Sequence, residues 1–274
     1  MNPAERHAAE RSIIEEAIES ICPHVLGNPL IPSTPEFKQA RFLGLHLGHD
    51  PDEVFHALYG GAAGGGKSEA LLMAAAQYAW RFPNFKGLIL RRTYTELSEP
   101  DAIMDRAIQW WYGKQGVHWS GSDKKIFTFP SGARVSFAYL SKPNDEIRYQ
   151  GASYHLVAID ELTQWKDAKQ PDYVGFSRCR RLDEDRSRIP LRYLCASNPG
   201  GPGHAWVRDR FIDDKEWPYL PATIDDNPHL DRESYVKSLM HLHPTVRAQL
   251  LRGDWTAREQ GDYFRAEWFG PLLD

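Results

Sequence analysis

Residues 61–68 have the types and the spacing of a loop that binds phosphate groups. The pattern G-x-x-x-x-G-K-[ST] lets backbone N–H groups converge on phosphates, while its lysine reaches the outer phosphates and its hydroxyl ligates Mg²⁺. An apolar run at 54–59 precedes the pattern and an Ala- and Leu-rich stretch at 68–80 follows it, as a strand and a helix should. The sequence therefore predicts a nucleoside triphosphate site formed by Gly61, Ala62, Ala63, Gly64, Gly65, Gly66, Lys67 and Ser68.

Two acidic residues end a second apolar run, at residues 155–161. Asp160 would hold Mg²⁺, and Glu161 would orient and deprotonate an attacking water molecule. Acids often begin surface turns, but after a phosphate loop in the same chain this pair indicates hydrolysis rather than binding alone. A third apolar run, at 191–196, leads to Asn198, which could sense the terminal phosphate or help to hold the attacking water. A strand that simply leads into a Gly- and Pro-rich loop would look much the same.

The apolar runs that carry these residues predict an α/β fold with a mainly parallel central sheet. Two further runs, at 125–129 and 134–140, are joined by Pro130-Ser131-Gly132, which is typical of a β-hairpin added to such a sheet. The remaining strands are expected at residues 54–59, 87–91, 155–159 and 191–196.

Helical patterns lie before and after the expected sheet. Residues 2–21 have apolar side chains at helical spacing, with acids on the other face. Residues 231–240 and 244–251 predict a small lid-like subdomain of two helices, which Gly253 ends. We therefore expect an N-terminal helical extension, a P-loop ATPase core, a helical lid subdomain and a linker, at residues 1–33, 34–220, 221–256 and 257–274.

Composition limits the other classes of protein. The 274 residues are 42% hydrophobic but contain no run of 18 apolar residues and no signal-peptide pattern, so we expect an intracellular protein that does not span a membrane. Three cysteines without metal-like spacing favour reduced thiols. His241 and His243 have no cysteine near them, so surface histidines are expected rather than a zinc site.

The formal net charge of −4 gives no general attraction to DNA. Two local groups of basic residues could still contact it. One follows Arg178 and includes Arg192, although acids at 183–185 interrupt it, and a solvated face is an equal alternative. The other is Lys124 and Lys125, beside the expected hairpin.

The order of the motifs resembles the large terminase subunit of tailed double-stranded DNA bacteriophages, the motor that packages the genome into a procapsid. The resemblance spans residues 34–269 and rests on linked segments at 58–68, 88–93, 129–133, 148–151, 160–164, 197–199 and 251–255. It implies a P-loop NTPase fold of the RecA-like (ASCE) type that uses ATP and Mg²⁺. It also implies double-stranded DNA, the portal protein, the small terminase subunit and a homo-oligomeric ring as partners, in the host cell cytoplasm at the procapsid portal. That ring would have five subunits on the procapsid, and the protein could be a monomer in solution.

The resemblance also implies roles for single residues. Arg148 matches the position of an arginine finger that acts on the neighbouring subunit's nucleotide, although a salt-bridged surface arginine is the alternative. Ser197 and Asn198 lie in the segment that couples hydrolysis to movement. Gln39 lies in a segment similar to the one that recognises adenine, although a lone glutamine is more often solvated.

The chain departs from the family pattern in two places. Many terminases have an arginine in the phosphate loop where this chain has Ala63, so that role must be absent or supplied elsewhere, with Arg91 and Arg92 as candidates. The usual large subunit also continues into a nuclease domain, whereas residues 261–264 look like the linker before it. We therefore expect the isolated motor half and no nuclease activity.

Two other functions are compatible with a phosphate loop. A non-packaging DNA helicase or remodelling ATPase usually needs a second motor domain, which this sequence lacks. A nucleotide-gated binding module or GTPase-like switch would carry an Asn-Lys-x-Asp segment, which is not found, and Glu161 beside Asp160 favours turnover.

Overall fold

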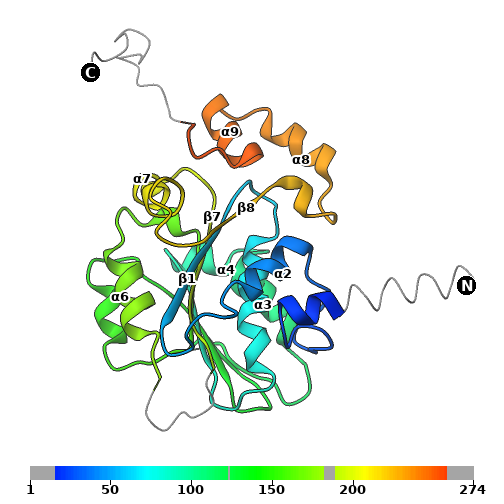
Figure 1. Cartoon of the computed structure of the whole chain (residues 1–274), viewed down its shortest axis with the longest axis vertical. Coiled ribbons are helices and arrows are strands. Elements are labelled where there is room, and N and C mark those ends of the chain that lie inside the picture. Colours follow the sequence, from blue (N-terminus) through cyan, green and yellow to red (C-terminus); the bar gives the residue numbers. More distant parts are fainter. Residues whose placement is uncertain (1–15, 123, 182–188, 258–274) are drawn as a thin grey trace, which may run out of the picture.

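The computed structural model describes residues 16–122, 124–181 and 189–257. Its centre is an eight-stranded sheet with the order β3-β4-β5-β2-β6-β7-β1-β8 (Figure 1). Every pair from β5 to β8 in this order is parallel, and β3 and β4 are added antiparallel at one edge. The strands are β1 Val54–Gly61, β2 Lys86–Arg91, β3 His118–Ser120, β4 Ile126–Thr128, β5 Arg134–Tyr139, β6 Leu156–Asp160, β7 Leu191–Ser197 and β8 Tyr219–Ala222.

The inner strands are apolar along their length because helices cover both faces of the sheet. On one face pack α2 (Phe37–Gly44), α3 (Lys67–Ala79), α4 (Tyr94–Ser98) and α5 (Ile103–Trp111). On the other face pack α6 (Lys169–Arg178) and α7 (His204–Arg208), which continues into the π-turn η3 (Asp209–Asp213). Side chains of β1 alternate between the two cores, with Tyr59 in the first and Leu58 in the second.

The lid subdomain consists of α8 (Arg232–Leu239) and α9 (Pro244–Arg252), drawn in orange at one end of the sheet in Figure 1. The 3-10 turn η4 (Ile224–Asp226) joins it to β8. Helix α9 ends where Gly253 adopts a φ of 65°, as expected for a helix-stopping glycine.

The predicted fold class is confirmed, including the hairpin, in which β4 pairs antiparallel with β5. Two strands were not predicted, β3 and β8, because each is short and β8 contains Pro221. The expected boundary after residue 220 falls inside β8, so the core sheet extends to Ala222. Of the expected N-terminal helix, residues 16–21 are helical, and the rest lies outside the described residues.

Three further sequence predictions concern the cysteines, two histidines and membrane-spanning helices. Cys22, Cys179 and Cys195 are buried, unpaired thiols. His241 and His243 are exposed. Among the described residues, no helix is both long and apolar enough to cross a membrane.

Candidate nucleotide-binding site

The chain turns from β1 into α3 through residues 62–66, and two glycines make this turn possible. Gly61 has a φ of 126°, and a Cβ atom there would lie only 2.4 Å from the carbonyl oxygen of Ala222. Gly66 caps α3 with a φ of 72°, a left-handed conformation that favours glycine. The first turn of α3 has backbone N–H groups without intrahelical partners, and the helix dipole adds positive charge there. The loop therefore has the geometry of an anion site.

The side chain of Lys67 is buried against this loop. Its side chain is 7% exposed, and Nζ donates a hydrogen bond to the carbonyl oxygen of Ala62. Burial lowers the pKa of Lys67, whereas the charges of Glu161 and Asp160 oppose that shift. An incoming phosphate would add negative charge beside the ammonium group, so Lys67 is placed to exchange the Ala62 carbonyl for a phosphate oxygen.

Two oxygen donors that suit Mg²⁺ meet beside the lysine. The Ser68 hydroxyl donates to Asp160 Oδ1 at 2.9 Å, and Arg91 Nε donates to Asp160 Oδ2 at 2.8 Å. Burial disfavours the Arg91 charge, but Asp160 and Glu161 outweigh it and raise the Arg91 pKa. Mg²⁺ binds proteins through one or two such oxygens and completes its octahedron with phosphates and water, so Ser68 and Asp160 fit this ion. Among the described residues, no group of three or more His, Cys, Asp or Glu side chains could hold a metal ion.

Glu161 follows Asp160 in a strained backbone conformation. Its φ of 58° is uncommon for a residue with a side chain, and such strain is often found at functional sites. Burial and the neighbouring Asp160 raise the pKa of Glu161, although Lys67, Arg91 and the N–H group of Asn198 oppose the shift. A carboxylate with a raised pKa is a better general base near neutral pH than an ordinary glutamate.

Asn198 completes this end of the site. Its backbone N–H group favours the charged form of the Glu161 carboxylate and so opposes the rise in its pKa, while its side-chain Oδ1 is buried without a hydrogen-bond partner. Both residues line one cavity of about 670 Å³, together with the phosphate loop, Lys67 and Ser68. The volume is in the range of ligand-binding pockets, and the unpaired acceptor points to a missing polar partner.

The lid closes part of this cavity and touches the phosphate loop directly. Leu250 of α9 accepts a hydrogen bond from the N–H group of Ala63 at 2.8 Å, and Asn227 Nδ2 donates to the carbonyl oxygen of Gly64 at 2.7 Å. Asn227, His229 and Leu230 also line the cavity. Movement of the lid would therefore alter these two hydrogen bonds to the phosphate loop.

Ser197 does not line the nucleotide cavity. It is fully buried, and its hydroxyl oxygen accepts a hydrogen bond from the N–H group of Thr163 at 3.1 Å and lies 2.9 Å from Thr163 Oγ1. Thr163 lies in the 3-10 turn η2 (Leu162–Gln164), directly after Glu161. Ser197 therefore joins the end of β7 to the turn that positions Glu161.

Gln39 is buried beside the loop and does not line the large cavity. Its Nε2 donates to the carbonyl oxygen of Gly66 at 3.0 Å, and its Oε1 accepts from the N–H group of Glu36 at 2.9 Å. It lines a small neighbouring cavity together with Thr34 and Glu69. In this conformation the amide supports the phosphate loop, and any contact with an adenine base stays a proposal.

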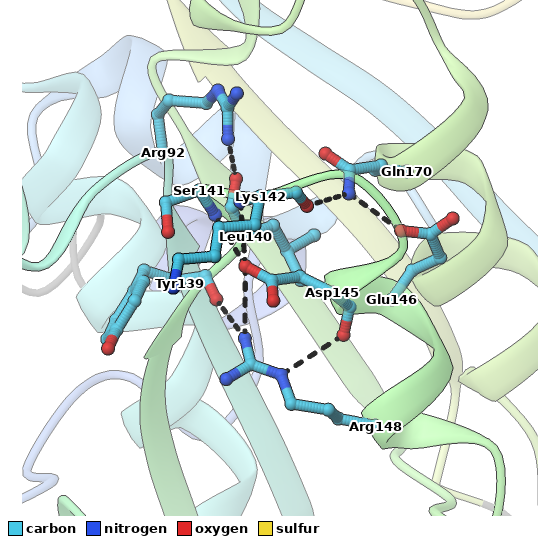
Figure 2. Close-up of polar contacts among 9 residues, drawn as sticks. All are labelled: Arg92, Tyr139, Leu140, Ser141, Lys142, Asp145, Glu146, Arg148 and Gln170. Carbon is cyan, nitrogen blue, oxygen red and sulfur yellow. Dashed lines mark hydrogen bonds and ion pairs between the residues drawn. The ribbon is translucent and has the colours of Figure 1, made fainter.

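Arg148 lies away from the nucleotide cavity of its own chain. It belongs to the 3-10 turn η1 (Asp145–Tyr149) and donates to the carbonyl oxygens of Tyr139 at 2.9 Å and Asp145 at 3.2 Å (Figure 2). Its guanidinium also lies 3.4 Å from the Asp145 carboxylate, and its side chain is 53% exposed. It lines a second cavity of about 520 Å³, with Lys124 and Lys125. The structure therefore brings Lys67, Ser68, Asp160, Glu161 and Asn198 together and leaves Arg148 outside that group.

The two arginines that could replace the one missing at Ala63 have different surroundings. Arg91 contacts Asp160 inside the site, as described above. Arg92 instead donates to the carbonyl oxygen of Leu140, near the turn η1 (Figure 2). A different arginine lines the nucleotide cavity, Arg106 of α5, which forms an ion pair with Glu69 at 3.0 Å. The sequence analysis missed it, and the only local signal was an acid, Glu69, placed directly after Ser68.

The basic segment after Arg178 does not behave as a single DNA-binding loop. Arg192 is fully buried and donates to Gln77 Oε1 and to the carbonyl oxygen of Ala74, so its proposed place in that loop is wrong. It lies on a buried strand, and its side chain enters the core beneath α3. Residues 182–188 lie outside the described residues.

Comparisons with known proteins give one family. The family model described as the terminase large subunit, T4likevirus-type, N-terminal, matches residues 58–271. Among solved structures, the large terminase from a thermophilic bacteriophage is 18% identical with a TM-score of 0.59, over 86% of this chain and 57% of that chain. The same terminase in complex with ADP is 19% identical with a TM-score of 0.56, over 81% and 54%. The HK97 bacteriophage large terminase is 12% identical with a TM-score of 0.60, over 86% and 55%.

At these identities the structural matches show a common fold. The chain spans a little over half the length of the terminases that it matches. Among curated proteins, none matches the chain.

Proposed function

This chain belongs to the family of large terminase subunits of the T4-like type, through its match to their N-terminal domain, and we propose that it is the Mg²⁺-dependent ATPase motor that moves double-stranded DNA into a procapsid. The observation that carries this proposal is the single cavity that joins the phosphate loop to Glu161 and Asn198. A binding module would need the loop alone, whereas hydrolysis also needs a base and a place for water.

Five residues in or beside the cavity have a task in hydrolysis. Lys67 binds the outer phosphates after its Nζ leaves the Ala62 carbonyl oxygen, and Ser68 and Asp160 would hold a Mg²⁺ ion that would offset the charge of the phosphates. Glu161 takes a proton from the attacking water as the water oxygen bonds to the γ-phosphorus atom, while the bond from that phosphorus to the oxygen shared with the β-phosphate breaks and ADP leaves. The Asn198 Oδ1 atom accepts a hydrogen bond from the other O–H group of the same water, which gives this buried oxygen a partner.

Coupling to movement begins at the same residues. The Asn198 N–H group stabilises the charged Glu161 carboxylate, so loss of the γ-phosphate would change the positions of Asn198 and Glu161 together. Ser197 transmits that change to η2 through Thr163. The hydrogen bonds from the phosphate loop to Leu250 and Asn227 offer a second path, to the lid.

Arg148 acts on the next subunit of a homo-oligomeric ring. It is half exposed and lies outside its own nucleotide cavity, which suits a residue that completes a neighbour's site. A guanidinium there would stabilise the charge that develops on the transferred phosphoryl group. We assign five subunits to the ring on the procapsid, with the portal protein and the small terminase subunit as further partners, in the cytoplasm of the host cell.

Hydrolysis of Mg-ATP by the chain tests this function, with the Glu161→Gln variant as the blank. We expect turnover in the wild type that double-stranded DNA stimulates more than single-stranded DNA. Equal turnover in the Glu161→Gln variant would remove the assigned base. Stimulation by single-stranded DNA alone would favour a helicase-type motor.

A further inference from the structure

A second cation besides Lys67 lies on the wall of the nucleotide cavity. Arg106 of α5 lines the cavity beside Glu69, and its NH1 atom lies 3.0 Å from Glu69 Oε1. Its NH2 atom donates to the carbonyl oxygen of Asp101 at 3.2 Å. The side chain is 28% exposed, so the guanidinium is held at the cavity wall without being sealed in the core.

The partner of Arg106 is poorly suited to a site for phosphates. Glu69 directly follows Ser68 in the first turn of α3, where its carboxylate interacts favourably with the helix dipole. A bound nucleotide would place further negative charge beside that carboxylate. The loop itself, residues 61–68, has no basic residue besides Lys67 to balance this charge.

The position of Glu69 shows which part of a nucleotide Arg106 would meet. Glu69 lines both the large cavity and the small neighbouring cavity that contains Thr34 and Gln39. Glu161, Asn198 and Arg106 itself line only the large cavity, so the cavity linings alone do not separate them. Arg106 pairs with Glu69, the residue after Ser68 in the first turn of α3, and the backbone N–H groups of a phosphate loop cradle the α- and β-phosphates, so this ion pair lies on the side of the inner phosphates.

We propose that Arg106 is a phosphate-binding residue, which exchanges its ion pair with Glu69 for the α- and β-phosphates of a bound nucleotide. This inference rests on the proposed function, because it assumes that the cavity holds ATP. It assigns a second positive charge at the loop to α5, which follows the loop after α3, β2 and α4. A planar guanidinium suits two phosphate oxygens at once, which a lysine cannot match.

Calorimetric titration of ADP and of a non-hydrolysable ATP analogue tests the proposal in the Arg106→Gln variant. We expect both affinities to fall by about tenfold, because a charged hydrogen bond is lost while the cost of breaking the Glu69 pair is no longer incurred. The loss should appear in the KM for ATP with little change in kcat. Loss for the ATP analogue alone would place Arg106 at the γ-phosphate and overturn the assignment.

A matched control separates binding from general damage. Arg208→Gln removes an arginine of similar exposure that pairs with Asp213 at 3.0 Å, far from the cavity lining. It should leave both nucleotide affinities unchanged. Equal losses in the two arginine variants would mean that Arg106→Gln acts through folding and would overturn the proposal.

The Glu69→Gln background distinguishes direct contact from an indirect role. If Arg106 only neutralised Glu69, then Arg106→Gln would have no effect on affinity once Glu69 is neutral. If Arg106 binds phosphates, the loss of about tenfold should persist in that background, and Glu69→Gln alone should tighten ADP binding. An effect that disappears in the Glu69→Gln background overturns the proposal.

The Lys67→Ala variant separates this inference from the function on which it rests. Loss of binding in Lys67→Ala with normal binding in Arg106→Gln would sink the inference and leave the nucleotide site standing. Normal ADP binding in Lys67→Ala would remove the nucleotide site itself.

Discussion

Replacement of Ser197 by alanine should damage hydrolysis without weakening nucleotide binding. Ser197 does not line the cavity, and its hydroxyl contacts Thr163, directly beyond Glu161 and Leu162. The variant would remove the acceptor of the Thr163 N–H group. It would leave every side chain that lines the cavity unchanged. The substitution therefore tests whether β7 positions the base through η2.

The structure gives the size of the expected stability loss. The Thr163 N–H group would stay buried without its acceptor, which costs about 1–3 kcal/mol. Thr163 Oγ1 keeps a second acceptor, the carbonyl oxygen of Asn198 at 3.3 Å, so the loss should stay near the middle of that range. About 2 kcal/mol corresponds to a fall in Tm of about 4–8 °C for a domain of this size.

The effect on catalysis should be larger than the effect on binding. A small displacement of a general base can lower kcat by about 100-fold, so we expect a fall of about 10- to 100-fold in the Ser197→Ala variant. Affinity for ADP should change by less than about threefold, since no phosphate contact is lost. Steady-state hydrolysis and calorimetric titration below the Tm of the variant measure the two quantities.

Ser131→Ala is the matched control for this substitution. The Ser131 hydroxyl donates to the carbonyl oxygen of Ala79 at 2.6 Å and accepts from the N–H group of Ala133, in the hairpin turn. That variant should lose stability and keep its kcat. A kcat within about twofold of wild type in Ser197→Ala would refute the positioning role, because misplacement of the base has a far larger effect. A large loss of ADP affinity would contradict the geometry.

The remaining predictions concern the base and the shared site. Hydrolysis should rise with pH through a pKa above the ordinary 4.5 of a glutamate, because burial and Asp160 raise the pKa of Glu161 and the base must lose its proton; a rate that falls over that range would contradict this role. Since the folded-state pKa of Glu161 is raised, its ionisation destabilises the fold above the unfolded value, so Glu161→Gln should raise the Tm of the nucleotide-free protein at neutral pH and lose that advantage in acid. If Arg148 acts in trans, an equal mixture of the inactive Arg148→Ala and Glu161→Gln variants should regain about a quarter of wild-type hydrolysis. A complete site then needs a subunit that keeps Glu161 beside a subunit that keeps Arg148, and random assembly places such a pair at about a quarter of the sites. No regain at protein concentrations where wild-type activity per subunit rises would place the finger elsewhere. Lys142→Ala should behave as wild type, because Lys142 contacts Asp145, the ion-pair partner of Arg148, through its backbone N–H group, which the substitution keeps.

Much of the fold could be predicted because its signals are local. Buried parallel strands are continuous apolar runs, so β1, β2, β6 and β7 were recognisable from the sequence. The short strands β3 and β8 were not, since three or four residues carry too little pattern and become strands only by pairing with neighbours. Register and strand order likewise depend on contacts between distant segments.

The candidate residues of the site could be identified from the sequence alone. The phosphate loop, Lys67, Ser68 and the acids at the end of β6 follow from residue types at fixed spacing, because each motif forms within one turn or one strand end. Their surroundings, in contrast, depend on the tertiary structure. It set Ser197 behind the site, kept Arg148 outside it, buried Arg192 beneath α3 and brought Arg106 to Glu69. These placements join elements far apart in the chain, and no local pattern specifies which polar side chain meets which partner once the helices pack on the sheet.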